Sequence, residues 1–183
     1  MPTEVLAFVS FIFLTGLVVG AAFFGRGPLG TLSVAYVLLA NLTILVEAPM
    51  YGGTIAWAII IYSATHLILN VVAEKHGIGA AVRIAIMNLC AQCLLWVYLW
   101  LFIPQNQIVN DETASIYGSL VTLFQSSTIV TIAALVGSVG WFANIFVYAF
   151  LKKLAENKGG IHIAARNIVS VAVGQVLNTV IFF

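Results

Sequence analysis

Residues 38–77 read LLANLTILVEAPMYGGTIAWAIIIYSATHLILNVVAEKHG, two apolar runs separated by the short segment EAPMYGG. Within each run the apolar residues are continuous and do not alternate with polar ones, which favours helices over the strands of a membrane barrel. The Gly- and Pro-containing segment between the runs predicts a connection. The second run nevertheless carries His66 and Asn70 one helical turn apart. Polar groups in hydrocarbon cost free energy unless they find partners, so these two residues need an explanation.

The composition extends this membrane character to the whole chain. Of its 183 residues, 62% are hydrophobic and 7% are charged, whereas soluble domains carry about 25% charged residues. Such a chain cannot build a water-facing surface, so we predict an integral membrane protein with helical spans. The net charge of +1 argues against a nucleic-acid partner. The two cysteines, Cys90 and Cys93, are expected to be small packed side chains without a redox or metal role.

Six segments are long and apolar enough to cross about 30 Å of hydrocarbon, which takes about 20 residues in a helix. We therefore predict an all-α membrane protein, a polytopic bundle of six transmembrane helices in a single domain over residues 1–183. The expected spans are 5–24, 29–46, 54–72, 80–103, 128–151 and 163–183. The longest connection, 104–127, ends in the stretch SIYGSLVTLF, which is expected either to lie along the interface or to form a lid.

The basic residues predict how the helices cross the membrane. If the N-terminus is outside, all seven fall on one face, the cytoplasmic one, as the positive-inside rule requires. They are Arg26, Lys75, Arg83, Lys152, Lys153, Lys158 and Arg166. The opposite face then receives Glu4, Glu47, Asp111 and Glu112. We expect an outside N-terminus and a multi-pass protein of the cell (plasma) membrane.

Polar residues form stripes on three of the expected helices, at spacings of three and four. The stripes are Ser63, His66, Asn70 and Glu74; Gly137, Trp141, Asn144 and Tyr148; and Ser170, Gly174, Gln175 and Asn178. Any single amide is commonly a hydrogen-bonding contact between helices, and a lone histidine is commonly a packed neutral residue. Three stripes together favour a polar cavity between these helices. Amides have donors and acceptors and do not titrate, so they suit a neutral planar ligand.

Three motifs in the second part of the chain resemble a known family. LNVVAEKHG (69–77) is followed by AAVR (80–83), GWFANIFVY (140–148) by Lys152 and Lys153, and GQVLNTVIF (174–182) follows Arg166 and Ser170. In this order and spacing they resemble the vitamin-uptake family of membrane proteins, which includes the queuosine precursor transporters. LLAN (38–41) also fits, so the resemblance covers about residues 36–183. The family has aspartate where this chain has Asn70, Asn144 and Asn178.

The resemblance implies a transporter that takes up a purine-like small molecule, a 7-deazaguanine precursor of queuosine. Substrates in such folds bind near the bilayer midplane between helices. The residues expected to bind it are His66, Asn70, Glu74, Trp141, Asn144, Gln175 and Asn178. The alternative is a non-transporting accessory subunit of a larger membrane complex. The asparagines at the family's aspartate positions favour that alternative, and so does the lack, in this sequence, of the further helix with which the family usually continues after the position of residue 183. Glu74, Gln175 and the amide stripes favour the transporter.

The sequence gives no support for an enzyme. It contains no phosphate-binding loop, no paired carboxylates within the spans and no Ser/His/Asp set. No cofactor is expected either. The expected partners are the lipid bilayer, a small-molecule ligand and either other membrane subunits or further copies of this chain.

Overall fold

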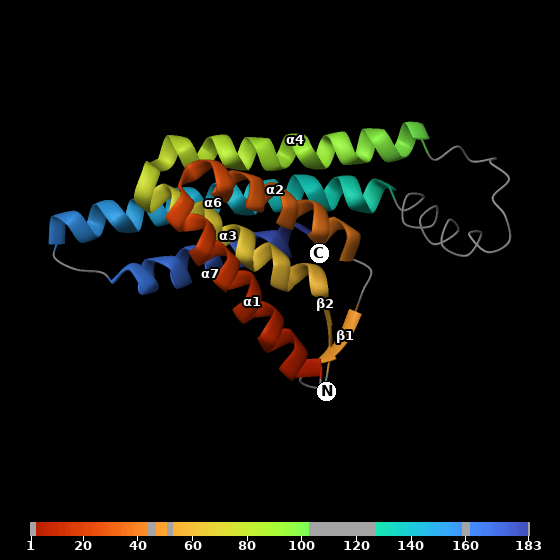
Figure 1. Ribbon diagram of the computed structural model, residues 1–183, viewed down its shortest axis with the longest axis horizontal. Helices are drawn as coiled ribbons and strands as arrows, with labels where there is room; N and C mark the ends of the chain where they lie inside the picture. The colour runs from red at the N-terminus through yellow and green to blue at the C-terminus, as the bar shows by residue number, and fades with distance from the viewer. Residues whose placement is uncertain (1–2, 44–46, 51–52, 103–126, 159–161, 183) are drawn as a thin grey trace, which may run out of the picture.

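The computed structural model describes residues 3–43, 47–50, 53–102, 127–158 and 162–182. Its helices are α1 (Thr3–Phe24), α2 (Arg26–Thr43), α3 (Trp57–His76), α4 (Ile78–Phe102), α6 (Ser127–Lys158) and α7 (Ile163–Phe182). A hairpin of two short strands, β1 (Glu47–Met50) and β2 (Gly53–Ala56), lies between α2 and α3. The described part of the chain is therefore helical as predicted, apart from the hairpin (Figure 1).

The hairpin corrects the predicted ends of two helices. We expected one span to continue to residue 46 and the next to begin at residue 54, but α2 ends at Thr43 and α3 begins at Trp57. The strands pair antiparallel, with Glu47 opposite Ala56 and Met50 opposite Gly53. Thr54 and Ile55 are β-branched and fit a strand well, and Pro49 is tolerated because the hairpin has only edge strands.

Two glycines reverse the chain between neighbouring helices. Gly25 follows α1 with a φ of 98°, and Gly77 follows α3 with a φ of 86°. A side chain would be strained in this left-handed conformation, so glycine is the usual residue just past a helix end. The Gly77 carbonyl also accepts the backbone N–H groups of Ala80 and Ala81, at 3.1 and 3.3 Å, and so starts α4. One residue thus ends one helix and begins the next.

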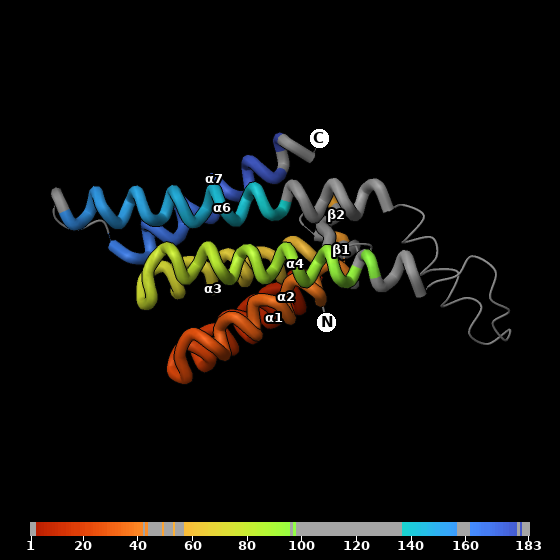
Figure 2. The backbone as a smooth tube through the Cα atoms, turned by 90° about the horizontal axis from the view of Figure 1, so that it is seen from above, coloured from red at the N-terminus to blue at the C-terminus, as the bar shows by residue number. Residues whose placement is uncertain are grey.

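Helix α3 is the centre of the bundle. It packs against α1, α2, α4, α6 and α7, and the tube in Figure 2 shows α3 and α4 between the pair α1/α2 and the pair α6/α7. Small residues such as Ala40, Ala64, Ala81 and Ala85 are fully buried at these contacts. Helix backbones can approach closely where side chains are small, which is how membrane helices commonly associate.

The apolar surface is that of a membrane protein. Three helices, Thr3–Phe24, Trp57–His76 and the segment Ile78–Leu95 of α4, are long and apolar enough to cross a membrane by length and composition, among the described residues. Helix α1 leaves large side chains such as Phe8, Phe13 and Phe23 exposed. Lipid is the solvent that suits such a surface.

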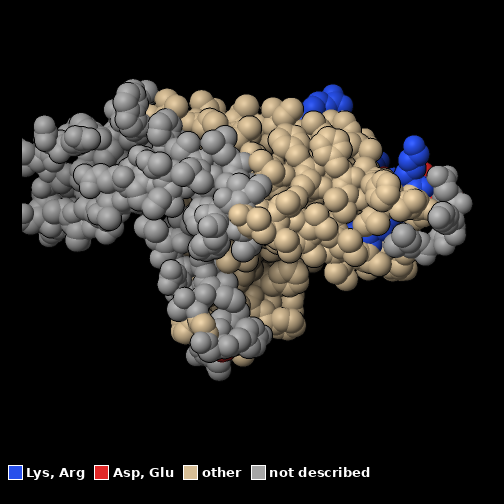
Figure 3. Space-filling view, turned by 180° about the vertical axis from the view of Figure 1, so that it is seen from behind, with Lys and Arg blue, Asp and Glu red and all other residues tan. Residues whose placement is uncertain are grey.

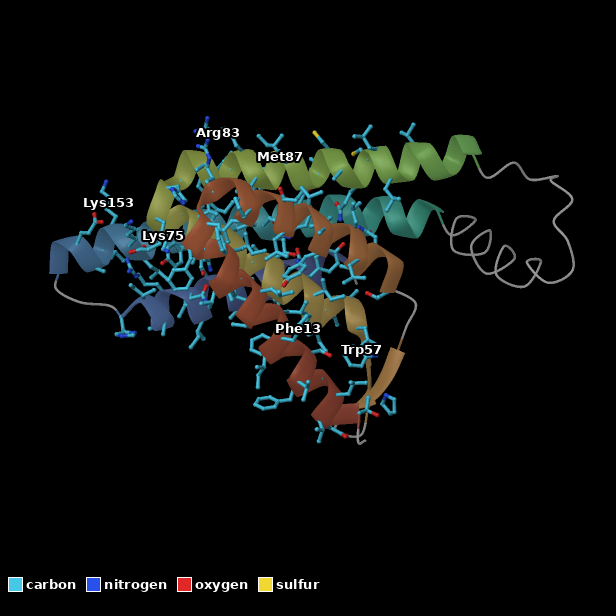
Figure 4. All side chains as sticks on the ribbon, in the orientation of Figure 1. Phe13, Trp57, Lys75, Arg83, Met87 and Lys153 are labelled. Carbon is cyan, nitrogen blue, oxygen red and sulfur yellow. The ribbon has the colours of Figure 1, made fainter. Side chains whose placement is uncertain are left out.

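The basic residues whose side chains the structure describes gather at one end of the bundle. Figure 3 shows the visible Lys and Arg side chains together at that end, and Figure 4 places Lys75, Arg83 and Lys153 there. The side chains of Lys158, Asp111 and Glu112 lie outside the described residues, as do the ends of the predicted spans at 103 and 183 and the predicted interface segment or lid, SIYGSLVTLF. Helix α6 continues to Lys158, two turns beyond the predicted end at residue 151, so Lys152 and Lys153 belong to the helix and not to a loop.

Candidate functional site

Four polar side chains meet where α3, α6 and α7 pack together. Asn70 of α3 and Asn144 of α6 pair through both amide groups: Asn70 Nδ2 donates to Asn144 Oδ1 at 3.3 Å, and Asn144 Nδ2 donates to Asn70 Oδ1 at 2.9 Å. From α7, Asn167 Oδ1 and Ser170 Oγ also accept from Asn70 Nδ2, the latter at 3.0 Å. Asn70, Asn144 and Ser170 are at most 2% exposed. We call these four residues the amide cluster.

The amide cluster offers more acceptors than its central donor can use. Asn70 Nδ2 has two hydrogens but lies within reach of acceptors on Asn144, Asn167 and Ser170. Ser170 uses its own hydroxyl hydrogen on the backbone carbonyl of Asn167, at 3.0 Å. At any moment one of these three acceptors is therefore without a hydrogen from Asn70 and can accept one from another donor. An N–H or O–H group of a neutral ligand would meet that need.

A charged layer lies one helical turn from the amide cluster, toward the basic end of the bundle. Glu74 Oε2 accepts from the Tyr148 hydroxyl at 3.0 Å and lies 3.4 Å from Lys152 Nζ. Glu74 Oε1 accepts from Arg166 Nη2 at 3.4 Å. The Arg166 guanidinium also stacks over the Tyr148 ring, 5.5 Å from its centroid, a favourable cation–π geometry. We call these four residues the charged layer.

On the other side of the amide cluster, two glycines bring α6 and α7 into close contact beside His66. A Cβ atom on Gly174 would lie 3.0 Å from the Gly140 carbonyl oxygen and 3.2 Å from His66 Cε1. A Cβ atom on Gly140 would overlap the side chain of Asn178, which therefore lies directly against α6. Neither ring nitrogen of His66, which is fully buried, has a hydrogen-bond partner among the described residues. Asn178 Oδ1 is likewise without a partner in that part of the chain.

Trp141 borders the same region from α6. It is fully buried, and its Nε1 has no acceptor among the residues that the structure describes. Its ring packs on Tyr62 of α3 at a centroid distance of 6.2 Å and an interplanar angle of 43°. The Tyr62 hydroxyl in turn accepts from Gln92 Nε2 of α4 at 3.0 Å. Buried polar atoms normally find partners, so His66, Trp141 and Asn178 mark a place where a polar ligand could be held.

The residues selected from the sequence fall into different layers of this interface. Asn70 and Asn144 meet, as the stripes predict, and His66 and Asn178 lie beside them at the contact between Gly140 and Gly174. Trp141 borders them through the ring contact with Tyr62. Glu74 faces three donors of the charged layer and not the amides. Gln175 is half-buried next to Gly174.

Several residues of the interface were not selected from the sequence. Asn167 is three residues before Ser170, so extending the stripe on α7 by one turn would have found it. Tyr148 appeared in the stripe on α6 without a role, and Lys152 follows it by one turn. Arg166 was expected at the cytoplasmic flank of the last span, but the structure buries it to 7% exposure. Its place in the third family motif, four residues before Ser170, was the signal in the sequence that could have marked it.

Two further amides bond to a neighbouring helix or within their own helix. A role in helix packing is what we expected for any single amide. Asn88 of α4 donates to Ser33 Oγ of α2 at 2.9 Å, and Asn41 donates to the Val37 carbonyl within α2 at 2.8 Å. Cys90 and Cys93 are free thiols and are exposed, not packed as we expected. These positions lie away from the amide cluster and serve helix packing or face outward.

Compared with known families, the chain matches over residues 56–183 the model described as "Putative vitamin uptake transporter". The match covers more than half of the chain and includes α3, α4, α6 and α7, so it contains the amide cluster and the charged layer. No curated protein and no solved structure matches the chain.

Proposed function

Because the chain belongs to the vitamin uptake transporter family, we propose that it takes up a neutral, purine-like molecule, a 7-deazaguanine precursor of queuosine. Membership of a transporter family favours transport over an enzymatic function. The site we propose is the interface of α3, α6 and α7. Asn70, Asn144 and Asn178 stand there at the positions where the family that the chain resembles has aspartates. The bundle would cross the plasma membrane six times with its N-terminus outside, as one domain.

The observation that carries this proposal is the concentration of unused hydrogen-bonding capacity at an interface whose central residues, Asn70, Asn144 and His66, are at most 2% exposed. Asn70 Nδ2 lies within reach of one acceptor more than it has hydrogens, and three neighbours, His66, Trp141 and Asn178, have polar atoms without partners among the described residues. Each unsatisfied buried polar group costs about 1–3 kcal/mol. A planar ligand with donors and acceptors on its edges would satisfy several of them, and Trp141 offers an aromatic face for stacking.

A second candidate function, an accessory subunit of a membrane complex, has its own supporting observation. Asn70 and Asn144 already satisfy one another through two hydrogen bonds, which is what helix packing alone would require. The two candidates differ in what should happen when ligand is added. An accessory subunit needs no ligand, and it should purify together with other membrane proteins.

Calorimetry on the detergent-solubilised protein with 7-deazaguanine as the probe tests the proposal. We expect saturable binding, and about tenfold weaker binding in Trp141→Phe, which keeps a ring but removes the Nε1 donor. Asn41→Leu is the matched control, because among the described residues its amide bonds within α2 and not to the amide cluster, and it should bind like the wild type. Affinity should change little between mildly acidic and neutral pH unless His66 takes part, since amides do not titrate. No heat of binding at millimolar probe would refute transport of this ligand class and leave the accessory-subunit function.

A further inference from the structure

The charged layer stands between the amide cluster and the basic end of the bundle on each of the three helices. On α3, Glu74 follows Asn70 by four residues, and on α6, Tyr148 follows Asn144 by four. On α7, which runs in the opposite direction along this interface, Arg166 precedes Ser170 by four. Four residues are about one helical turn. A molecule that moves from the amide cluster toward the basic end between these helices therefore has to pass the charged layer.

The burial of the charged layer fits a boundary between the interior and that end. The side chain of Arg166 is 8% exposed, whereas those of Glu74 and Lys152 are 27% and 30% exposed. Behind them, Asn70, Asn144 and Ser170 of the amide cluster are at most 2% exposed. The exposed fraction thus rises across the charged layer toward the basic end, where Figure 4 places Lys75 and Lys153.

The three helices are tied together at this level by one carboxylate. Glu74 of α3 holds Tyr148 and Lys152 of α6 and Arg166 of α7, and its backbone carbonyl also accepts from Lys152 Nζ at 3.3 Å. Hydrogen bonds to a charged acceptor are about twice as strong as neutral ones. Because a single carboxylate serves donors on two other helices, loss of its charge weakens all of these contacts together. Without it, Lys152 and Arg166 would also repel one another.

We propose that the charged layer is a closure over the amide cluster on the basic side, held by Glu74, and that its opening admits or releases the ligand at that end. The closure would control access of the ligand to the site, and this role rests on the proposed function. The closure itself is a physical property of the helices. It can be measured without any ligand.

A buried reporter thiol tests the closure. Ser170 is fully buried behind the charged layer, so Ser170→Cys, in a chain with Cys90→Ala and Cys93→Ala, should react slowly with a small methanethiosulfonate reagent in detergent. Adding Glu74→Gln should raise the labelling rate about tenfold or more, because the opening equilibrium loses a charge-assisted contact to each neighbouring helix. Tyr148→Phe removes one contact to Glu74, and Lys152→Gln removes the ion pair with its carboxylate and the hydrogen bond to its backbone carbonyl. Both leave the Arg166 contact in place and should raise the rate by a smaller factor.

Lys153→Gln is the matched control. Lys153 is the neighbour of Lys152 in the same helix but is exposed and lies outside the charged layer, so the labelling rate should stay at the wild-type value. Equal labelling in Glu74→Gln and in its parent would overturn the closure, and so would an equal rise in Lys153→Gln. If Glu74→Gln does not fold, Lys152→Gln and Tyr148→Phe decide, and unchanged rates in both would overturn it.

Binding of 7-deazaguanine is measured separately on the same substitutions in a chain that keeps Ser170, because Ser170 belongs to the amide cluster. Faster labelling in Glu74→Gln together with no binding in any variant, the wild type included, would refute the proposed ligand and leave the closure standing. Normal binding together with unchanged labelling would refute the closure and leave the proposed function. The two outcomes are therefore distinguishable.

Discussion

The reciprocal amide pair between α3 and α6 allows a quantitative prediction about stability. In Asn70→Leu the pair loses both of its hydrogen bonds, at 3.3 and 2.9 Å, and leaves the Asn144 amide buried without them. Leucine is close to asparagine in size, so the change is mainly one of polarity. The lost contacts to Asn167 and Ser170 add to the effect.

The magnitude follows from two general values. Interhelical hydrogen bonds in membranes contribute on average about 0.6 kcal/mol each, so losing two of them lowers the stability by about 1 kcal/mol. An amide left buried without partners costs about 1–3 kcal/mol. We therefore expect Asn70→Leu to lower the free energy of unfolding by about 1–3 kcal/mol. Asn144→Leu should cost less, since it breaks the same two bonds but leaves Asn70 its contacts to Asn167 and Ser170.

The double variant measures the coupling between the two amides, which the single variants do not give. Replacing both partners by apolar groups removes the unsatisfied amide, so Asn70→Leu/Asn144→Leu should be less destabilised than the sum of the single variants, by about 1–2 kcal/mol. Reversible unfolding of the four proteins in mixed micelles, followed by tryptophan fluorescence, measures this coupling. Asn41→Leu should lose little stability, because the Val37 carbonyl that Asn41 contacts already accepts a backbone N–H in the helix. Purely additive costs would show that the two amides do not interact as the structure describes, and the reasoning would fail.

Two further predictions concern helix packing and orientation. Gly174→Ala should destabilise the protein by about 1–3 kcal/mol, because its Cβ would meet the Gly140 carbonyl at 3.0 Å and the His66 ring at 3.2 Å; Gly140→Ala should cost less, because it meets the side chain of Asn178, which is half-buried and can shift. Thermal unfolding of both variants gives the order, and an equal or reversed order would contradict the packing. For orientation, a cysteine at Lys153 should be protected from an impermeant thiol reagent in intact cells and one at Glu4 should react, both in a chain without Cys90 and Cys93. Labelling of position 153 from outside would overturn the outside N-terminus.

The membrane class and the helices of this protein follow from its sequence alone. Continuous apolar runs with 7% charged residues leave no soluble alternative, and the glycines at 25 and 77 mark two helix ends. The collection of the basic residues at one end also followed from their places between the runs. The polar stripes were visible too, because side chains three and four residues apart share a face of a helix. All of these are properties of one segment at a time.

Only the tertiary structure decided which levels of the helices meet. A stripe tells which face of a helix is polar, but the rotation and axial shift of one helix against another depend on the packing of all side chains between them. For this reason the sequence did not predict that Asn167 belongs to the amide cluster. Nor did it predict that Arg166, expected at the membrane flank, is a buried partner of Glu74. The same holds for Glu74, which was selected for a ligand and lies one turn away among cations. The hairpin at residues 47–56 was missed for a related reason: its strands are stabilised by pairing with one another, and four residues of either strand alone carry too little pattern to predict it.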